Sequence, residues 1–263
     1  MKESLMRFIR YQNKKEEIHF GWVFEDRVGP LTGSPLAEYR KLDASLLLEK
    51  VTLLAPIIPT KIVCIARNYK EHAKEQGVEV PAYPTLFMKP ITSIIGPKQT
   101  IILPPQSQQI EYEAELGVVI GKRGRWITAE KANQYIFGFT IVNDVTARDL
   151  QQRDGQWTRA KGFDTFCPLG PWIETELDVT DIMISTYING ELRQMGSTRD
   201  MVFSISQLIA YISSIMTLEP GDLILTGTPA GVGPIRAGDR IEIKIDGIGK
   251  LENSVAEDKK VVK

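Results

Sequence analysis

The chain has 263 residues, 43% of them hydrophobic and 25% charged, which is typical of a globular protein long enough to bury a substantial core. Its 32 Lys and Arg residues nearly balance 33 Asp and Glu residues, so the composition excludes a broad electrostatic attraction to nucleic acid or to a membrane surface. The N-terminus lacks an apolar signal core, and no apolar run of about 18 residues occurs. We therefore expect a cytoplasmic protein with neither a nucleic-acid nor a membrane partner.

The first part of the chain, residues 1–57, is predicted to form a small β-rich domain. Residues 18–24 have the composition of a strand, and Gly29-Pro30 is a turn signal. Residues 53–59 contain two prolines, each of which disfavours helix in the residue before it, so this segment is expected to be an extended connector. A second and larger domain is predicted over residues 58–263.

The second part is mostly β by pattern, with few helices. One predicted helix covers residues 128–135 with Thr128 as its N-cap, and another covers 204–216, where apolar residues recur at helical spacing. Many strands with few helices predict a β-rich α+β fold with mixed or antiparallel sheets, not a doubly wound fold. The predicted strands are 61–66, 93–96, 100–103, 113–121, 136–144, 184–188, 222–226 and 240–245.

Between the first two of these strands, His72 and Glu75 lie three residues apart in a short helix-like segment. Residues at this spacing share one helix face. A carboxylate that accepts a hydrogen bond from one imidazole nitrogen fixes the tautomer and raises the basicity of the other nitrogen, so the pair could activate a water molecule. The spacing alone also describes an exposed histidine with an incidental neighbour.

The segment around residue 113 carries three acidic residues with period two, namely Glu111, Glu113 and Glu115. In a strand this spacing places them on one face, about 6.5–7 Å apart. A row of like charges is unfavourable unless solvent or a cation neutralises it, and carboxylate oxygens are the ligands that Mg²⁺, Mn²⁺ and Ca²⁺ prefer. An exposed edge strand is the alternative, although the following Gly-Val-Val-Ile run favours a strand buried on both faces.

Two later segments add polar groups at strand ends. Asp144 ends the apolar run 136–144, where it could bind a cation or cap the next helix. Residues 225–234 form a strand followed by a Gly-rich loop that lacks the Lys-Ser/Thr ending of a nucleotide-binding loop. The backbone N–H groups of this loop at Gly227, together with the Thr228 hydroxyl, could hold a substrate carboxylate, or the loop could simply be a tight turn.

Taken together, six motifs resemble the fumarylacetoacetate hydrolase superfamily. They occur in the family's order over about 175 residues, and six motifs in order form a specific signal where one alone would mean little. The motifs are KIVCIARNY (61–69), TLFMKP (85–90), EAELGVVIG (113–121), NDVTARDLQ (143–151), AKGFDTFCP (160–168) and LTGTPAGVGP (225–234).

This resemblance implies a catalytic domain of the mixed β-sandwich roll type, which usually dimerises. It also implies one Mg²⁺ or Mn²⁺ ion held by Glu113, Glu115 and Asp144, with open positions for water and a bidentate 2-oxo acid. Glu111 lies outside the ligand set and is expected either to support the ligands or to face solvent.

The resemblance also implies roles for residues whose spacing alone is ambiguous. His72 and Glu75 would form a catalytic dyad on a mobile segment, and Lys161 would stabilise an enolate or carboxylate oxygen near the metal. Three further residues are candidates for orienting a substrate carboxylate: Arg67, Arg148 and Gln151. For Arg148, a structural ion pair is the alternative.

The sequence therefore predicts a divalent-metal-dependent enzyme that acts on small 2-oxo or 2,4-dioxo carboxylic acids. The first hypothesis is cleavage of a carbon–carbon bond, by hydrolysis of an acylpyruvate or by decarboxylation of oxaloacetate. The second is a 2-hydroxyhepta-2,4-diene-1,7-dioate isomerase, which shuttles protons without attack by water. The third is a non-catalytic metal- or ligand-binding protein that has kept the fold, and it is disfavoured because every catalytic position is retained.

Overall fold

The computed structural model describes residues 6–259, and most of the elements in this part of the chain are strands. A twelve-stranded sheet runs through the molecule in the order β4-β3-β2-β1-β14-β12-β11-β17-β6-β7. Strand β5 is paired with β1, and β8 with β14, beside this path. The prediction of a β-rich α+β fold is confirmed.

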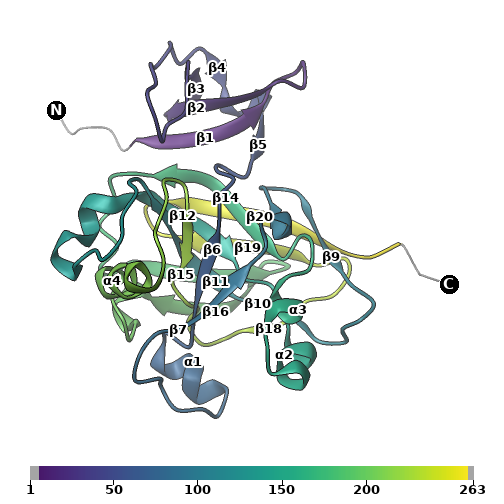
Figure 1. Ribbon diagram of the computed structural model, residues 1–263. Coiled ribbons are helices and arrows are strands. Elements are labelled where there is room, and N and C mark those ends of the chain that lie inside the picture. Colours follow the sequence, from purple (N-terminus) through teal and green to yellow (C-terminus); the bar gives the residue numbers. More distant parts are fainter. Residues whose placement is uncertain (1–5, 260–263) are drawn as a thin grey trace.

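The N-terminal strands form one end of this sheet and lie above the body of the molecule in Figure 1. These strands are part of the large sheet because β1 pairs with β14 in antiparallel orientation. Residues 53–59, expected to be an extended connector, contain the end of β5 and then lead to β6. The strands here are β1 (Arg7–Gln12), β2 (Ile18–Phe24), β3 (Arg27–Pro30), β4 (Leu46–Leu47) and β5 (Thr52–Leu54), with one 3₁₀ turn, η1 (Leu48–Lys50).

The central strands are apolar on both faces, which explains their place in the middle of the sheet. All seven residues of β11 are buried, and β11 lies between β12 and β17. The central strands are β6 (Ile62–Ala66), β11 (Ala114–Ile120), β12 (Ile136–Asn143), β14 (Cys167–Glu174) and β17 (Leu223–Leu225). Strand β7 (Thr85–Lys89) ends the sheet beside β6, and β8 (Ile94–Ile95) pairs only with β14.

A five-stranded sheet packs against this centre and closes a sandwich. Its order is β16-β15-β19-β20-β9, and its contacts with the large sheet are β15 on β11, β19 on β12 and β20 on β14. Apolar side chains that alternate along β15 and β19, such as Ile184 and Ile243, meet Leu116 and Ile141 in the core. The strands are β9 (Thr100–Leu103), β15 (Met183–Ile188), β16 (Glu191–Ser197), β19 (Arg240–Ile245) and β20 (Gly249–Glu257).

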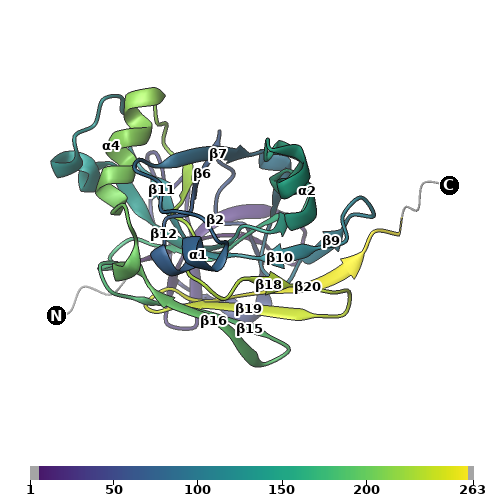
Figure 2. The same ribbon diagram turned by 90° about the horizontal axis from the view of Figure 1, so that it is seen from below.

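Helices lie at the ends and edges of the sandwich. Figure 2 shows α1 in front of the sheets, with α4 and α2 on either side. In the described part of the chain, no helix has the length and apolar character needed to cross a membrane. The helices are α1 (Lys70–Glu75), α2 (Arg148–Asp154), α3 (Thr158–Lys161) and α4 (Ile205–Ile215), and the other 3₁₀ turns are η2 (Ile91–Ser93), η3 (Ala129–Tyr135) and η4 (Thr198–Asp200).

The two predicted helices have different outcomes. The helix expected over residues 128–135 is a 3₁₀ helix, and the Thr128 side chain caps no backbone N–H group of it. The helix over residues 204–216 forms as predicted, because Ser204 and Gln207 complete a capping box.

The strand predicted over residues 113–121 begins one residue later, at Ala114, because the chain changes sheets at Glu113. The preceding strand belongs to a separate three-stranded sheet in the order β13-β10-β18. These strands are β10 (Ile110–Tyr112), β13 (Thr146–Ala147) and β18 (Gly233–Pro234). Glu113 therefore sits at a junction between two sheets, a position that a regular alternation of residues does not reveal.

Candidate active site

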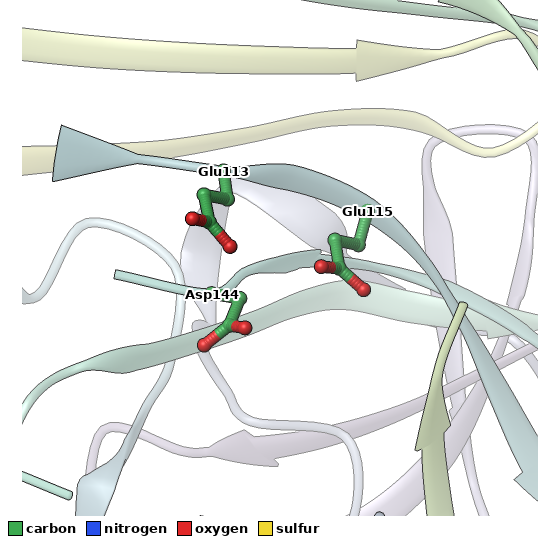
Figure 3. Close-up of side chains that lie close together, drawn as sticks. All are labelled: Glu113, Glu115 and Asp144. Atoms are coloured by element: carbon green, nitrogen blue, oxygen red, sulfur yellow. The ribbon is translucent and has the colours of Figure 1, made fainter. Parts of the chain in front are cut away.

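Three acidic side chains converge at the junction between β10 and β11. Glu113 occupies the junction, Glu115 lies on β11 and Asp144 follows the end of β12. The antiparallel pairing of Ala114 with Asn143 brings the two strand ends together, and the Asp144 backbone N–H donates to the Glu113 carbonyl at 2.8 Å. Figure 3 shows the three carboxylates close together, and one oxygen from each lies within 4.8 Å of the others.

These carboxylates are almost completely withdrawn from solvent, with exposed fractions of 4% for Glu113, 2% for Glu115 and 0% for Asp144. Burial raises the pKa of Glu115 well above its ordinary value, and repulsion from Asp144 and Glu113 raises it further. Burial also opposes ionisation of Glu113, but the charges of Lys161 and Arg148 outweigh it and hold the Glu113 pKa well below its ordinary value. The centre is therefore an electrostatically strained group of acids that positive charge stabilises.

Two buried lysines supply part of that charge. The Lys161 ammonium donates to Glu113 Oε2 at 2.7 Å and to Asp144 Oδ2 at 2.6 Å. Burial lowers the Lys161 pKa, but attraction to Asp144 and Glu113 outweighs it, so the net shift is upward and the ammonium stays charged. The Lys89 ammonium donates to Asp144 Oδ1 at 2.6 Å and to the Val145 carbonyl at 3.1 Å.

Lys89 was missed as a site residue by the sequence reasoning, although it lies in the TLFMKP motif. It ends β7, and pairing of β7 with β6 carries it into the interior. A single lysine at the end of a strand gives no local signal of burial. Only its place in a motif shared with the family could have identified it.

Arg148 is engaged entirely with protein groups. Its Nε donates to Glu111 Oε2 at 2.8 Å, its Nη1 to Gln151 Oε1 at 2.6 Å and its Nη2 to Glu113 Oε1 at 2.5 Å. Of the two roles considered for Arg148, the structure supports the structural ion pair. Glu111 is buried and paired, so it supports the ligand set and does not face solvent.

The predicted dyad forms on α1. His72 Nδ1 lies 3.1 Å from Glu75 Oε2, and His72 Nε2 lies 3.0 Å from the side-chain nitrogen of Gln76. A carboxylate partner at Nδ1 requires the proton there, which leaves Nε2 as the basic nitrogen that accepts from Gln76. The Gly231 N–H donates to Glu75 Oε1 at 3.0 Å, so the Gly-rich loop orients the carboxylate. Sequence reasoning did not single out Gln76.

The Gly-rich loop supports the acidic strand. The Gly227 N–H donates to Glu115 Oε2 at 2.7 Å, and the Thr228 hydroxyl donates to the Ala114 carbonyl at 2.8 Å. Gln194 donates to the Thr228 hydroxyl oxygen at 2.6 Å. These bonds give Gly227 and Thr228 a role in fixing the position of Glu115, and their contact with substrate stays a prediction.

Two spaces with shared lining residues lie beside the acidic centre. The inner one, about 20 Å³, is lined by His72, Glu113, Glu115, Lys161 and Thr228. The outer one is a cleft of about 500 Å³ lined in part by Glu75, Gln109, Glu111 and Val232. The residues that line both spaces are Arg67, Gln76, Arg148, Gln151 and Trp157, so every predicted site residue except Asp144 and Gly227 borders one space or the other.

The donor set fits a hard divalent cation. Three carboxylates supply oxygen ligands from one small region, and Mg²⁺ and Mn²⁺ prefer oxygen ligands. The repulsion that raises the Glu115 pKa is the kind of strain that such a cation relieves. Glu113, Glu115 and Asp144 would hold the ion, and the donor chemistry does not distinguish Mg²⁺ from Mn²⁺.

Comparison with known families gives two matches that cover most of the chain. Residues 61–256 match the family described as fumarylacetoacetate (FAA) hydrolase C-terminal. Residues 6–56 match the family described as Rv2993c-like, N-terminal. The first match contains the acidic centre, both lysines and the dyad.

Individual relatives include proteins with different reported activities. The human mitochondrial oxaloacetate tautomerase FAHD2A is 47% identical over 219 residues, which are 78% of this chain and 70% of the relative. The crystal structure of 2-hydroxyhepta-2,4-diene-1,7-dioate isomerase from Mycobacterium marinum is 42% identical, with a TM-score of 0.89 and coverage of 97% of this chain and 100% of that one. Fumarylacetoacetate hydrolase from psychrophilic Exiguobacterium antarcticum is 38% identical, with a TM-score of 0.87 and coverage of 96% and 100%.

Proposed function

This chain belongs to the fumarylacetoacetate hydrolase family, and we propose that it is a divalent-cation-dependent tautomerase that interconverts the keto and enol forms of oxaloacetate. The observation that carries the proposal is the meeting of a basic nitrogen, an ammonium group and an acidic centre at one buried space. His72, Lys161, Glu113 and Glu115 all line that space. A relative at 47% identity is named for this reaction.

The reaction requires a proton to leave C3 of oxaloacetate and a proton to reach the oxygen at C2. Neither step breaks the carbon skeleton, so the product has the mass of the substrate. We propose His72 Nε2 as the group that accepts and returns the proton, because Glu75 holds the imidazole proton at Nδ1. Gln76, which contacts Nε2, must yield that nitrogen to the substrate.

Negative charge develops on the C2 oxygen in the enolate. Lys161 offers a buried ammonium to stabilise that charge, and it stays charged because it lies between Glu113 and Asp144. When bound at the three carboxylates, a divalent cation supplies Lewis-acid polarisation of the 2-oxo group. Low exposure of the centre to water strengthens these electrostatic effects.

Cleavage of a carbon–carbon bond is the second candidate function. In hydrolysis of an acylpyruvate, the His72–Glu75 pair would take a proton from water, and hydroxide would add to the 4-oxo carbon. The C3–C4 bond would then break, and return of the proton to C3 of the enolate would give pyruvate beside the carboxylic acid. The arrangement of His72 beside Glu75 suits this step, and a structural relative is named as a fumarylacetoacetate hydrolase. The oxaloacetate decarboxylase and dienedioate isomerase hypotheses use the same stabilised enolate.

The test is turnover of oxaloacetate and acetylpyruvate with identification of the products, first with Mg²⁺ or Mn²⁺ and then with EDTA. We expect metal-dependent acceleration of the keto–enol exchange of oxaloacetate, followed by ultraviolet absorbance and NMR, with no change of mass. Pyruvate and acetate from acetylpyruvate would favour the hydrolase, and pyruvate with carbon dioxide from oxaloacetate would favour the decarboxylase. Turnover of neither compound would move the assignment to the dienedioate isomerase.

A further inference from the structure

Arg67 stands at the border between the inner space and the outer cleft, where β6 ends. Its backbone has φ of +57°, a left-handed conformation that is strained for a residue with a side chain. The next residue fixes this conformation, because the Asn68 side chain donates to the Thr226 carbonyl at 2.8 Å and accepts from the Phe203 N–H at 2.8 Å. Such strain is retained where a side chain must point in a particular direction.

The Arg67 guanidinium has no hydrogen-bond or ion-pair partner within residues 6–259, and its Nε is buried without one. Trp157 contributes a ring face 6.0 Å from the guanidinium carbon. A buried donor without a partner is costly, so an acceptor absent from the protein itself is expected there. Arg148, in the same cleft, differs because all of its contacts go to Glu111, Glu113 and Gln151.

The charges around the two spaces point to an anionic acceptor. Four buried carboxylates, those of Glu111, Glu113, Glu115 and Asp144, face three buried cationic side chains, those of Lys89, Lys161 and Arg148. This buried set carries one net negative charge, so a divalent cation would leave one positive charge, which the carboxylate of a 2-oxo acid balances. Glu75 in the outer cleft is engaged by His72 and the Gly231 N–H, so Arg67, which lies outside the buried set, is left for a second carboxylate.

The sizes of the two spaces fit a small acid whose second carboxylate lies in the outer cleft. The inner space, about 20 Å³, is of the order of one or two water-sized positions. The outer cleft, about 500 Å³, has room for the rest of a small organic acid. A group that extends from the acidic centre into the cleft passes Arg67 and Trp157, which line both spaces.

We infer that Arg67 binds the distal carboxylate of a 2-oxo dicarboxylic acid and thereby selects dicarboxylic over monocarboxylic substrates. This inference rests on the proposed function for its placement of the 2-oxo end at the acidic centre. Arg148 positions the ligand carboxylates through its bonds to Glu111 and Glu113. Arg67 is accordingly a specificity-determining residue of the site.

The test measures binding of two inert ligands to the Mn²⁺-loaded protein by calorimetry. Malate and 2-hydroxybutanoate share a carboxylate and a neighbouring hydroxyl, and they differ because malate has a second carboxylate where 2-hydroxybutanoate has a methyl group. We expect the unaltered protein to bind malate roughly 10- to 150-fold more tightly, the range for a hydrogen bond to a charged group. Arg67→Gln should remove this preference and leave the affinity for 2-hydroxybutanoate within about threefold.

Matched variants separate a specific contact from a general loss of positive charge. Arg153 lies on α2 with a side chain that is 62% exposed and does not line either space, so Arg153→Gln should leave the malate preference within about twofold. Arg67→Lys keeps the charge and loses the planar fork, so it should retain a smaller preference for malate. Thermal unfolding of each variant reports whether the fold is kept.

Each outcome bears on a separate conclusion. Equal weakening of both ligands by Arg67→Gln would place Arg67 at the carboxylate that they share and would overturn the inference, as would an unaltered protein that shows no preference for malate. A preference that disappears in Arg67→Gln, in a protein that does not tautomerise oxaloacetate, would support the dicarboxylate subsite and reject the proposed reaction. Undiminished tautomerisation in Arg67→Gln, together with unchanged malate binding, would support the proposed reaction and reject the dicarboxylate subsite.

Discussion

The acidic centre and the proton-transfer arm are built in opposite ways, although they face the same space. The acidic centre consists of Glu113, Glu115 and Asp144 with Lys89 and Lys161, and all five are buried, the first four on strands or beside strand ends and Lys161 at the end of α3. The proton-transfer arm is α1 with the loop that follows it, residues 70–84. It has only six helical residues, and Figure 2 shows it in front of the sheets.

The acidic centre and the proton-transfer arm depend on different kinds of interaction. In the acidic centre Glu113, Asp144, Lys89 and Lys161 each have a buried partner of opposite sign, so the loss of one of these groups leaves another uncompensated. In the arm the dyad is held by hydrogen bonds between residues three and four apart and by one bond from the Gly231 N–H to Glu75, and several loop side chains are exposed. Changes in the centre should affect both stability and activity, whereas changes in the arm should affect activity alone.

The largest effect is expected from Asp144→Ala, which removes the acid that both buried lysines contact. Two ammonium groups would then lack their shared partner, and breaking a buried charge pair costs about 3–5 kcal/mol. We expect a loss of unfolding free energy in that range together with loss of detectable metal-dependent turnover. Denaturant unfolding and the oxaloacetate assay measure the two effects on one preparation.

Asp178→Ala is the matched control for this change. Asp178 carries local hydrogen bonds to Thr180 and is exposed, so its loss should change stability by no more than about 1 kcal/mol. If Asp144→Ala were as stable as the control, the view of the acidic centre as a mutually dependent charge group would be wrong.

The sequence predicted the three acids of the centre better than the residues that hold them in place. Period two singled out Glu111, Glu113 and Glu115, and a strand end singled out Asp144, because both are local patterns; the resemblance to the family was needed to select Glu113, Glu115 and Asp144 as one ligand set. Lys89 and the Gly227 contact with Glu115 depend on pairing between strands far apart in the chain, and no local pattern encodes such pairing.

The same distinction explains the outcome for the secondary structure. The helix over 204–216 was predictable because Ser204 and Gln207 form a local capping box, and β9 and β19 have the predicted bounds. The change of sheet at Glu113 was not predictable, because it follows from the partners of β10 and not from the residues of β10 itself. Likewise, nothing local indicates that β1 joins the large sheet through β14.

His72→Asn tests the arm. Removal of a positioned acid–base group lowers rates by about 10²- to 10⁴-fold, so we expect kcat for tautomerisation to fall within that range. The unfolding free energy should change by about 1 kcal/mol or less, because the dyad is held by local contacts. Steady-state kinetics and denaturant unfolding check both expectations.

Lys74→Gln is the control on the same helix, since its side chain is 78% exposed and contacts only Glu71 at the surface among the described residues. It should leave both quantities nearly unchanged. A His72→Asn protein with full activity would show that the arm takes no part in the reaction. One that fails to fold would show that the arm, like the acidic centre, is needed for stability.

Metal addition and removal test the centre without a change to its neighbours. A cation that binds only the folded chain stabilises it by about 2.7 kcal/mol at one hundred times its dissociation constant. For a chain of this size that corresponds to about 5–10 °C in melting temperature. We expect Mn²⁺ to produce this shift and EDTA to reverse it, as measured by scanning calorimetry.

Glu115→Gln sharpens the same experiment. The amide oxygen still accepts from the Gly227 N–H, but one of the three ligand charges is lost. The Mn²⁺ shift should therefore disappear, while the metal-free variant should melt no lower than the unaltered metal-free protein, because repulsion with Asp144 and Glu113 is relieved. A lower melting temperature without metal would show that Glu115 stabilises the fold by a route other than cation binding.

The smallest effect is expected at Asp149, which lies at the border between the buried centre and the surface. Its carboxylate accepts hydrogen bonds from the Ser107 hydroxyl at 2.5 Å and from the Gln108 N–H at 3.0 Å, and so ties α2 to the segment before β10. Burial raises the Asp149 pKa, but these hydrogen bonds outweigh it and hold the pKa below its ordinary value of 3.8.

A depressed pKa of this kind makes the contribution of Asp149 depend on pH in a defined direction. The folded chain binds the proton less readily than the unfolded chain, so the stabilisation is fully present above about pH 5 and is lost as the pH falls through 3.8 and below. Asp149→Asn should therefore cost about 1 kcal/mol of unfolding free energy at pH 7, and the difference from the unaltered protein should shrink toward pH 3. Urea unfolding at several pH values measures it. A difference that stayed constant with pH would attribute the loss to packing, and one as large as that of Asp144→Ala would extend the charge-dependent centre out to the surface of α2.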